Sequence, residues 1–326
     1  MTQEIAEKVY AEIAAADRIV ISRHIRPDGD AVGSSMGLRA IIKAPIPEKE
    51  VLYVGGDKAD YLAFFENEDE MPDDEFCSSA LLIILDSGTL DRVSNEKIGL
   101  FKRIVKLDHH IDDNPFGDLS VVEEFRTSTC ELIVDLCVKL GGKLKMTAEA
   151  AEYLYIGMVT DSGRFRFNGT TGETLRYAAM LLDYGFNTER IFANLYLDSF
   201  ENLSFRSRMF GHIKQTENGV AYIFVSKEIR ESENITLEQA SQTVMLLDSI
   251  KNDLIWLAFI ETDDGEIRVR LRSRFVGIKD LASRYGGGGH ENASGATCRS
   301  LEEVDSLIND ADAILADFKK NNTGWL

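Results

Sequence analysis

Short apolar runs alternate with amphipathic stretches along the first half of the chain. The run at 81–85 is apolar at every position, which is typical of a strand covered on both faces of a parallel sheet. Similar runs predict strands at 18–22, 51–54, 80–85 and 103–107, and helical spacing predicts helices at 1–17, 31–42, 129–140 and 147–159. This alternation predicts an α/β fold with a doubly wound, mainly parallel sheet.

The pattern changes near residue 202, after two predicted helices at 173–183 and 187–198. Beyond it, the chain predicts strands at 221–225, 254–261 and 267–274, a hairpin turn at 262–265, and helices at 236–249 and from 300 onward. Glu303, three residues after Ser300, predicts a capping box at the last helix. We therefore expect a second, smaller α+β domain with a mixed or antiparallel sheet, and a cleft between the two domains.

The composition is that of a globular chain long enough for two domains. Of the 326 residues, 44% are hydrophobic and 28% are charged. The sequence has no apolar stretch of membrane-spanning length and no signal pattern, so we expect a cytoplasmic protein without a membrane partner. The four scattered cysteines predict packed, reduced thiols. The net charge of −19 argues against the wrapping of long nucleic acid, which requires many basic contacts.

Three polar blocks each follow a predicted strand. They are His24-Ile25-Arg26-Pro27-Asp28-Gly29-Asp30, Leu85-Asp86-Ser87 and Leu107-Asp108-His109-His110. Because the carboxyl ends of parallel strands meet at one edge of a sheet, we expect these side chains to lie together. A single Asp at such a place usually caps a helix or turn, and a single His in an apolar run usually packs in a core. Three of the five histidines lie in these blocks, however, which favours a metal site.

Charge counting extends the prediction to two ions. Four carboxylates would repel one another at this edge without compensation: Asp28, Asp30, Asp86 and, after the helix at 147–159, Asp161. Two divalent cations would cancel this charge, with His24 and His109 as neutral ligands. A carboxylate that bridges two ions about 3.5–4 Å apart serves displacement at phosphorus. Mixed imidazole and carboxylate ligands suit Mn²⁺, Fe²⁺, Co²⁺ or Zn²⁺ better than Mg²⁺, and we expect Mn²⁺.

Two features of the second half could hold an anion. The first is a run of alternating arginines, which a strand would place on one face: Arg268, Arg270, Arg272 and Arg274. The alternative is the solvated face of a half-buried sheet. The second feature is the glycine run at 286–289, followed by His290, where backbone N–H groups could approach a phosphate closely. The alternative is a flexible linker.

In this order, the motifs resemble those of the DHH phosphoesterase superfamily with its C-terminal DHH-associated domain. The resemblance covers essentially the whole chain, and it points to the bacterial oligoribonuclease (nanoRNase) and pAp-phosphatase subgroup. It is carried by HxxxDxD at 24–30, Asp86, the literal Asp108-His109-His110, Asp161 and the late glycine–histidine run. It implies a catalytic domain with a dinuclear metal site at 1–186, a helical linker at 187–204 and a substrate-binding domain at 205–326.

The resemblance also implies roles for individual residues. One Mn²⁺ would be held by His24, Asp28 and Asp86, and the other by Asp30, Asp86, His109 and Asp161, with Asp86 bridging. His110 would contact the scissile phosphate, as electrostatic stabiliser or proton donor, and Asp108 would orient a histidine. The substrate would be bound by Arg272, Ser273, Arg274, Gly287, Gly288, Gly289 and His290. Arg268 and Arg270 match less clearly, and Arg164 and Arg166 are weaker candidates for the same role.

The implied function is metal-dependent hydrolysis of short oligoribonucleotides or linear dinucleotides to 5′-nucleotides, with dephosphorylation of pAp as a second activity. One alternative is turnover of cyclic dinucleotides or pApA in signalling, and another is a nucleotide-binding sensor with weak catalysis. The acidic charge disfavours the long single-strand exonucleases of the superfamily, and the glycine run disfavours its inorganic pyrophosphatases. The oligomeric state is left open, with a homodimer as one alternative.

Overall fold

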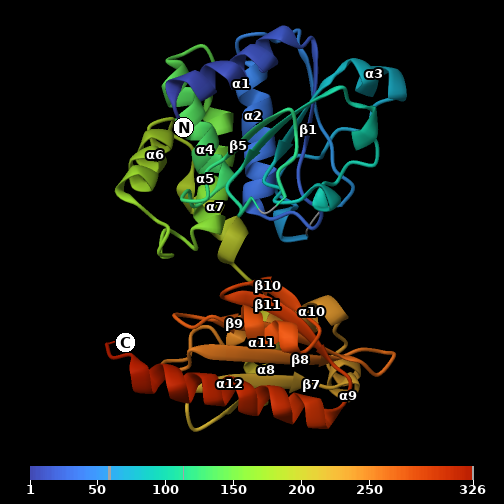
Figure 1. The fold of residues 1–326 in the computed structure, drawn as a ribbon, viewed down its shortest axis with the longest axis vertical. Coiled ribbons are helices and arrows are strands. Elements are labelled where there is room, and N and C mark those ends of the chain that lie inside the picture. Colours follow the sequence, from blue (N-terminus) through green and yellow to red (C-terminus); the bar gives the residue numbers. More distant parts are fainter. Residues whose placement is uncertain (58–59, 113, 325–326) are drawn as a thin grey trace. The chain divides into compact units, whose positions relative to one another are not determined.

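The computed structural model describes residues 1–57, 60–112 and 114–324 and divides the chain into two compact units (Figure 1). Unit 1 is Met1–Leu197 and unit 2 is Asp198–Leu326. The predicted linker at 187–204 spans this division. Helix α7 (Thr188–Tyr196) packs on the core of unit 1 through Ile191, whereas α8 (Phe200–Phe210) packs on that of unit 2 through Met209.

The described residues of unit 1 form the predicted parallel sheet, with five strands in the order β2-β1-β3-β4-β5. The strands are β1 (Arg18–Ser22), β2 (Glu50–Tyr53), β3 (Leu81–Leu85), β4 (Arg103–Asp108) and β5 (Leu119–Val122). The main core lies between this sheet and the helices α1 (Gln3–Ala15), α2 (Gly29–Lys43), α4 (Thr129–Leu140), α5 (Ala148–Asp161) and α6 (Gly172–Leu182). Helix α3 (Asp74–Ser79) packs on the other face. The strand order reverses between β1 and β3, where such folds place their ligands.

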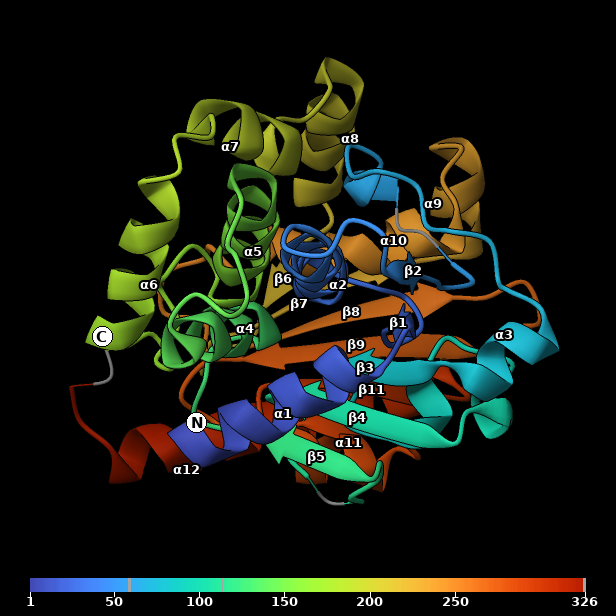
Figure 2. The same cartoon turned by 90° about the horizontal axis from the view of Figure 1, so that it is seen from above.

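Glycines allow α2, α4 and α5 to pack closely. Figure 2 views α2 almost along its axis, with α5 beside it. A Cβ at Gly33 would lie 2.5 Å from the backbone oxygen of Tyr153. A Cβ at Gly157 would lie 2.2 Å from Sγ of Cys130. Larger side chains would force these helices apart, because protein interiors have no spare volume. The close packing brings the start of α2 next to the end of α5.

The described residues of unit 2 form a mixed sheet of six strands in the order β10-β11-β9-β8-β7-β6. The strands are β6 (Lys214–Gln215), β7 (Val220–Val225), β8 (Ile255–Glu261), β9 (Ile267–Ser273), β10 (Gly288–His290) and β11 (Ala293–Cys298). Only the β7–β8 pair is parallel among these described strands. One face packs on α11 (Lys279–Arg284) and α12 (Leu301–Asn321), and the other on α8, α9 (Lys227–Ser232) and α10 (Leu237–Gln242).

Two details of unit 2 differ from the sequence predictions. The helix expected at 236–249 ends early as α10 and continues as the 3₁₀ turn η4 (Thr243–Leu246), where the Thr243 hydroxyl donates to the Ala240 carbonyl. Ser300 caps α12 as predicted, but the Glu303 carboxylate accepts from the N–H of Arg299 and does not close a capping box. The four cysteines are buried and unpaired, as expected. Among the described residues, we find no helix with the length and apolar character that crossing a membrane requires.

Candidate metal centre

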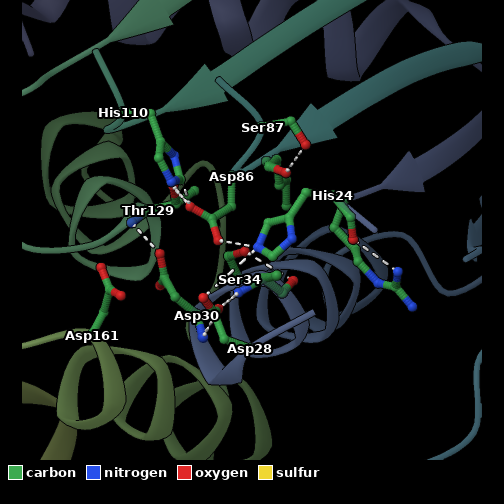
Figure 3. A network of polar contacts seen from close by, with 12 residues as sticks. His24, Asp28, Asp30, Ser34, Asp86, Ser87, His110, Thr129 and Asp161 are labelled. Carbon is green, nitrogen blue, oxygen red and sulfur yellow. Dashed lines mark hydrogen bonds and ion pairs between the residues drawn. The ribbon is translucent and has the colours of Figure 1, made fainter. Parts of the chain in front are cut away.

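The three polar blocks meet at the carboxyl edge of the unit 1 sheet, as predicted (Figure 3). His24 follows β1, Asp86 follows β3, and His110 follows β4. Figure 3 shows these side chains directed toward the start of α2, with Asp161 approaching from the end of α5. The structure thus brings all six predicted metal ligands into one cluster: His24, Asp28, Asp30, Asp86, His109 and Asp161.

Asp86 stands at the middle of this cluster. It is 1% exposed, with Oδ2 3.4 Å from Nε2 of His24 and Oδ1 3.4 Å from Nε2 of His109. Its Oδ1 also accepts from the hydroxyl of Thr129 at 3.1 Å. Burial alone would raise the pKa of Asp86, but the hydrogen bonds from His109 and His24 lower it well below its usual value. Each carboxylate oxygen therefore faces a different histidine.

Two sets of ligand atoms flank Asp86. Within each set, one ligand atom per residue lies within 4.8 Å of the others, and the sets are His24, Asp28, Asp86 and Asp30, His109, Asp161. A third group of the same kind joins Asp86 to His109 and His110. In the second set, Nε2 of His109 is 3.2 Å from Oδ2 of Asp161 and 3.9 Å from Oδ2 of Asp30. Converging imidazole and carboxylate donors at such separations fit a divalent cation in each set.

Helix N-termini fix two of the carboxylates. Asp28 caps α2, where its Oδ1 accepts from the amides of Asp30 and Ala31, both at 3.0 Å. Asp30 is fully buried and accepts from the first two amides of α4, Thr129 at 2.7 Å and Cys130 at 2.9 Å. The positive ends of the two helices stabilise negative charge at these points. Both carboxylates are therefore held in place by the fold itself.

The raised pKa values of two carboxyl groups in the cluster, Asp30 and Asp161, favour a bound cation. Burial, and then the charges of Asp86 and Asp161, raise the pKa of Asp30 well above its usual value. Burial also raises the pKa of Asp161 to about 7, against the opposing effect of His109. The helix ends thus offset only part of the negative charge, and divalent cations would compensate the rest.

His110 is linked to a buried lysine through Asp108. Oδ1 of Asp108 lies 2.8 Å from Nδ1 of His110, and its Oδ2 lies 3.4 Å from Nζ of Lys106. Burial opposes protonation of His110, but the hydrogen bond to Asp108 and the charge of Asp86 raise its pKa. The sequence analysis missed Lys106, although a charged residue inside an apolar strand is itself a signal, because full burial of a lysine requires a partner.

Arg126 supports His109 from outside the ligand sets. Its backbone carbonyl oxygen lies 3.2 Å from Nδ1 of His109, which orients the other ring nitrogen toward the carboxylates. Its guanidinium is buried and bonds to Glu123, Glu131 and Glu173 at 2.8–3.0 Å. No sequence signal identifies this role, because it depends on a backbone atom.

In unit 2, Arg268, Arg270 and Arg272 alternate with buried residues along β9, as predicted, whereas the fourth arginine, Arg274, lies just beyond the end of the strand. Arg272 is half-buried and has no carboxylate partner among the described residues. Burial and the neighbouring Arg270 lower the pKa of Arg272. The Arg274 guanidinium lies 4.9 Å from the ring centroid of Trp256. The half-buried guanidinium of Arg272, without a carboxylate partner among the described residues, is therefore a candidate for binding an anion.

Ser273 lies on the opposite face of β9 from Arg272. It is buried, and its hydroxyl donates to the carbonyl of Val276 at 2.6 Å and accepts from the side-chain amide of Asn292 at 3.0 Å. Successive residues of a strand point to opposite faces, so Ser273 and Arg272 cannot face one ligand together. Ser273 therefore supports the turn after β9.

The glycine run forms an edge strand and not a free linker. Its last two glycines and His290 form β10, which pairs antiparallel with β11. A Cβ at Gly287 would lie 1.9 Å from the backbone oxygen of Gly295, and one at Gly289 would lie 2.6 Å from that of Ala293. Such close approach of two backbones requires glycine.

Gly287 and its neighbour Gly288 provide a matched test of this close backbone packing. We expect Gly287→Ala to destabilise unit 2 by about 1–3 kcal/mol, since the added methyl group collides with backbone. Gly288→Ala should change the free energy of unfolding by less than about 0.5 kcal/mol, because no atom lies within 4 Å of its Cβ position. Urea unfolding of the full chain, followed by circular dichroism, measures both. Equal midpoints for the two variants would contradict the expectation.

Known proteins share both the sequence and the fold. The chain matches the DHH family, N-terminal domain, over residues 18–158 and the DHHA1 domain over residues 217–317. It is 37% identical over 310 residues to the bifunctional oligoribonuclease and PAP phosphatase NrnA of Bacillus subtilis, covering 94% of this chain and 97% of that protein. A probable NrnA of Streptococcus mutans is 33% identical, with coverage of 94% and 98%.

The fold also has a close counterpart among solved structures. The crystal structure of an exopolyphosphatase-related protein from Bacteroides fragilis matches with a TM-score of 0.87 at 25% identity, over 97% of this chain and 98% of that chain. The two matched domains occur in the order that the motifs predicted. The chain therefore belongs to the DHH family and carries the DHHA1 domain after the DHH domain that contains the candidate metal ligands.

Proposed function

We propose that this protein is a metal-dependent phosphoesterase that hydrolyses short oligoribonucleotides and linear dinucleotides to 5′-nucleotides and also dephosphorylates pAp. The observation that carries the proposal is the cluster of six imidazole and carboxylate ligands around Asp86. The substrates are supported by the relatives from Bacillus subtilis and Streptococcus mutans, whose names combine oligoribonuclease and PAP phosphatase. We also propose that the enzyme acts in the cytoplasm.

The proposed cofactor is a pair of divalent cations, with Mn²⁺ as the first choice. One would be held by His24, Asp28 and Asp86, and the other by Asp30, Asp86, His109 and Asp161. When bound, such ions supply an activated water and neutralise the charge that develops on the phosphate. Asp86 places Oδ2 beside His24 of the first set and Oδ1 beside His109 of the second, which fits a bridging role.

The reaction breaks the bond between phosphorus and the 3′ oxygen. An oxygen atom from water attaches to phosphorus, and the departing 3′ oxygen takes up a proton. His110 fits the donor role, because its raised pKa favours the protonated ring and Asp108 fixes its Nδ1 side. In pAp, the same bond joins the 3′ oxygen to the terminal phosphate, so one arrangement of residues serves both substrates.

Unit 2 supplies the binding site for the substrate in this proposal. Its members are Arg272, Arg274, Gly287, Gly288, Gly289 and His290. The half-buried, unpaired charge of Arg272 supports the binding of a phosphate group. Ser273 contributes indirectly, through the turn that its hydroxyl supports.

The test is turnover by the purified full chain with Mn²⁺ and one of four substrates: pApA, pAp, a labelled long RNA and cyclic di-AMP. We expect AMP from pApA and pAp, slow loss of long RNA, and no turnover after chelation with EDTA. Tight binding of pApA without hydrolysis would favour a sensor. Preference for cyclic di-AMP would favour the signalling alternative, which is suggested by a 25% identical match to the cyclic-di-AMP phosphodiesterase GdpP of Geobacillus thermodenitrificans.

A further inference from the structure

Beside the metal-ligand cluster, unit 1 carries two exposed tyrosines and an arginine that the proposed reaction does not use. We propose that these residues, Tyr61, Arg164 and Tyr196, form a subsite that stacks on the base of the second nucleoside of a dinucleotide. We call them the rim cluster. The inference rests on the proposed function and deepens it, because it separates the diester substrate from pAp.

Three segments place the rim cluster next to the carboxylates. Arg164 follows Asp161 by three residues, just after α5. Tyr196 is the last residue of α7, which packs against the 3₁₀ turn η1 (Asp60–Leu62) that carries Tyr61. Partial burial raises the pKa of Tyr61, and the charges of Asp28 and Asp161 act in the same direction, in agreement with the packing of η1 against α7.

Within the cluster, Arg164 lies over an aromatic ring. Its guanidinium carbon is 4.4 Å from the ring centroid of Tyr196. Arg164 has no carboxylate partner among the residues that the structure describes. Tyr61 is 51% exposed, whereas Tyr196 is 40% exposed and its ring centroid lies 5.8 Å from that of Phe192. The accessible stacking surfaces are therefore the Tyr61 ring and the exposed Arg164 guanidinium, which Tyr196 supports. A guanidinium plane and an open aromatic ring are the surfaces on which single-stranded bases stack.

The turn that carries Arg164 has a left-handed backbone conformation, which most residues disfavour. Gly163, Arg164 and Phe165 have φ angles of +57°, +64° and +61°, a left-handed run that residues with a Cβ disfavour. The turn is held by Ser162, whose hydroxyl accepts from the N–H of Phe165 at 2.8 Å. The Phe165 ring packs 6.2 Å from that of Tyr155. Strained backbone that its surroundings hold in place is typical of functional sites.

The chemistry of the two substrates identifies the part that the rim cluster would bind. pAp and pApA are identical up to the phosphorus that is attacked, and only pApA carries a second nucleoside on it. With that phosphorus at the ligand cluster, the second nucleoside must lie within one nucleotide of the carboxylates. Arg164 follows the candidate ligand Asp161 by three residues and lies over Tyr196, which places the rim cluster in that neighbourhood. Stacking accepts every base, as an enzyme for mixed RNA fragments requires.

The test compares the two substrates in one enzyme. We expect Tyr196→Ala to lower the ratio of kcat/KM for pApA to that for pAp about tenfold, the effect of losing one stacked base. Arg164→Ala should lower the ratio in the same direction, and Tyr196→Phe, which keeps the ring, should preserve it. Tyr184→Ala is the matched control, because Tyr184 is 41% exposed at the end of α6 and lies outside the cluster.

A second comparison uses a dinucleotide whose second nucleotide lacks its base, so that the loss of the base and the loss of Tyr196 can be tested separately and together. On that substrate, Tyr196→Ala should have the same kcat/KM as the wild type, since the base that would stack is already absent. An unchanged ratio in both Tyr196→Ala and Arg164→Ala would overturn the inference. Equal losses on pApA and pAp, or a lower melting temperature that accounts for the loss, would also overturn it and assign these residues to structural support. A wild type that hydrolyses neither substrate would instead overturn the proposed function.

Discussion

Asp86→Asn is expected to slow hydrolysis of both pApA and pAp by about a thousandfold or more. Asp86 is the residue with an oxygen beside each of two histidines, His24 and His109. Asparagine keeps the shape but offers one oxygen and one NH₂ group, so one cation loses a ligand and the bridge is broken. Loss of several kcal/mol of transition-state stabilisation corresponds to a factor of about 10³. Steady-state rates with Mn²⁺, together with the metal content of the purified variant, measure the effect.

The same variant makes a second prediction that separates ligand loss from misfolding. Without metal, Asp86→Asn should still unfold cooperatively but melt somewhat lower than the wild type, because it removes the charge that the hydrogen bonds from His24 and His109 stabilise. The rise in melting temperature on addition of Mn²⁺ should shrink. Asp73→Asn is the matched control, since Asp73 caps α3 away from the cluster and asparagine also caps helices. Wild-type rates in Asp86→Asn would refute the bridging role.

Arg126→Met is expected to lower the free energy of unfolding of unit 1 by about 3–5 kcal/mol. Arg126 is 6% exposed, and its guanidinium contacts Glu131 at 3.0 Å and Asp135 at 3.2 Å besides two further glutamates. Methionine fills much of the space but leaves the buried carboxylate of Glu131 without its cation and leaves Asp135 with the Met1 ammonium group as its remaining cation. The measurement is urea unfolding of the full chain at neutral pH.

The loss in Arg126→Met should also depend on pH. Burial would raise the pKa of Asp135, but hydrogen bonds from the Met1 ammonium group and Tyr177 and the charge of Arg126 lower it. A carboxyl whose pKa is lowered by folding stabilises the fold above its unfolded pKa and loses that contribution as pH falls. The deficit of the variant should therefore be full at pH 7 and shrink only as the pH falls below about 4, the unfolded pKa of an aspartate. Arg190→Met, which removes an exposed ion pair with Glu152, should cost less than about 1 kcal/mol at either pH.

The strands that could be predicted are those whose own residues specify them. The continuous apolar run of β3 and the strict alternation of β9 each carry a complete local signal. By contrast, β11 consists of small residues, and β10 is largely glycine, so neither has much strand propensity. Both become strands through pairing with β9 and with each other, which is information from the tertiary structure.

The candidate site divides in the same way. The clustering of the six candidate ligands could be predicted because they stand at strand and helix ends, where chain order already implies position. Lys106 and Arg126 could not, because their roles depend on contacts with Asp108 and with His109 across the fold. Ser273 was grouped with Arg272 by motif alone, although strand alternation already separates their faces. A motif thus indicates proximity along the chain and leaves the direction of side chains to the strand geometry.

The amide bonds at Asp28 and Asp30 have a consequence for the divergence of related sequences. Each of these aspartates begins or braces a helix with the same carboxylate that is proposed to bind metal. Selection for folding alone would therefore retain them, even in a descendant that had stopped hydrolysing anything. The Asp161 carboxylate, at the last residue of α5, pairs with His109 and accepts no backbone amide among the residues that the structure describes. In a lineage drifting from enzyme to binding protein, Asp161 is the ligand that we expect to change first.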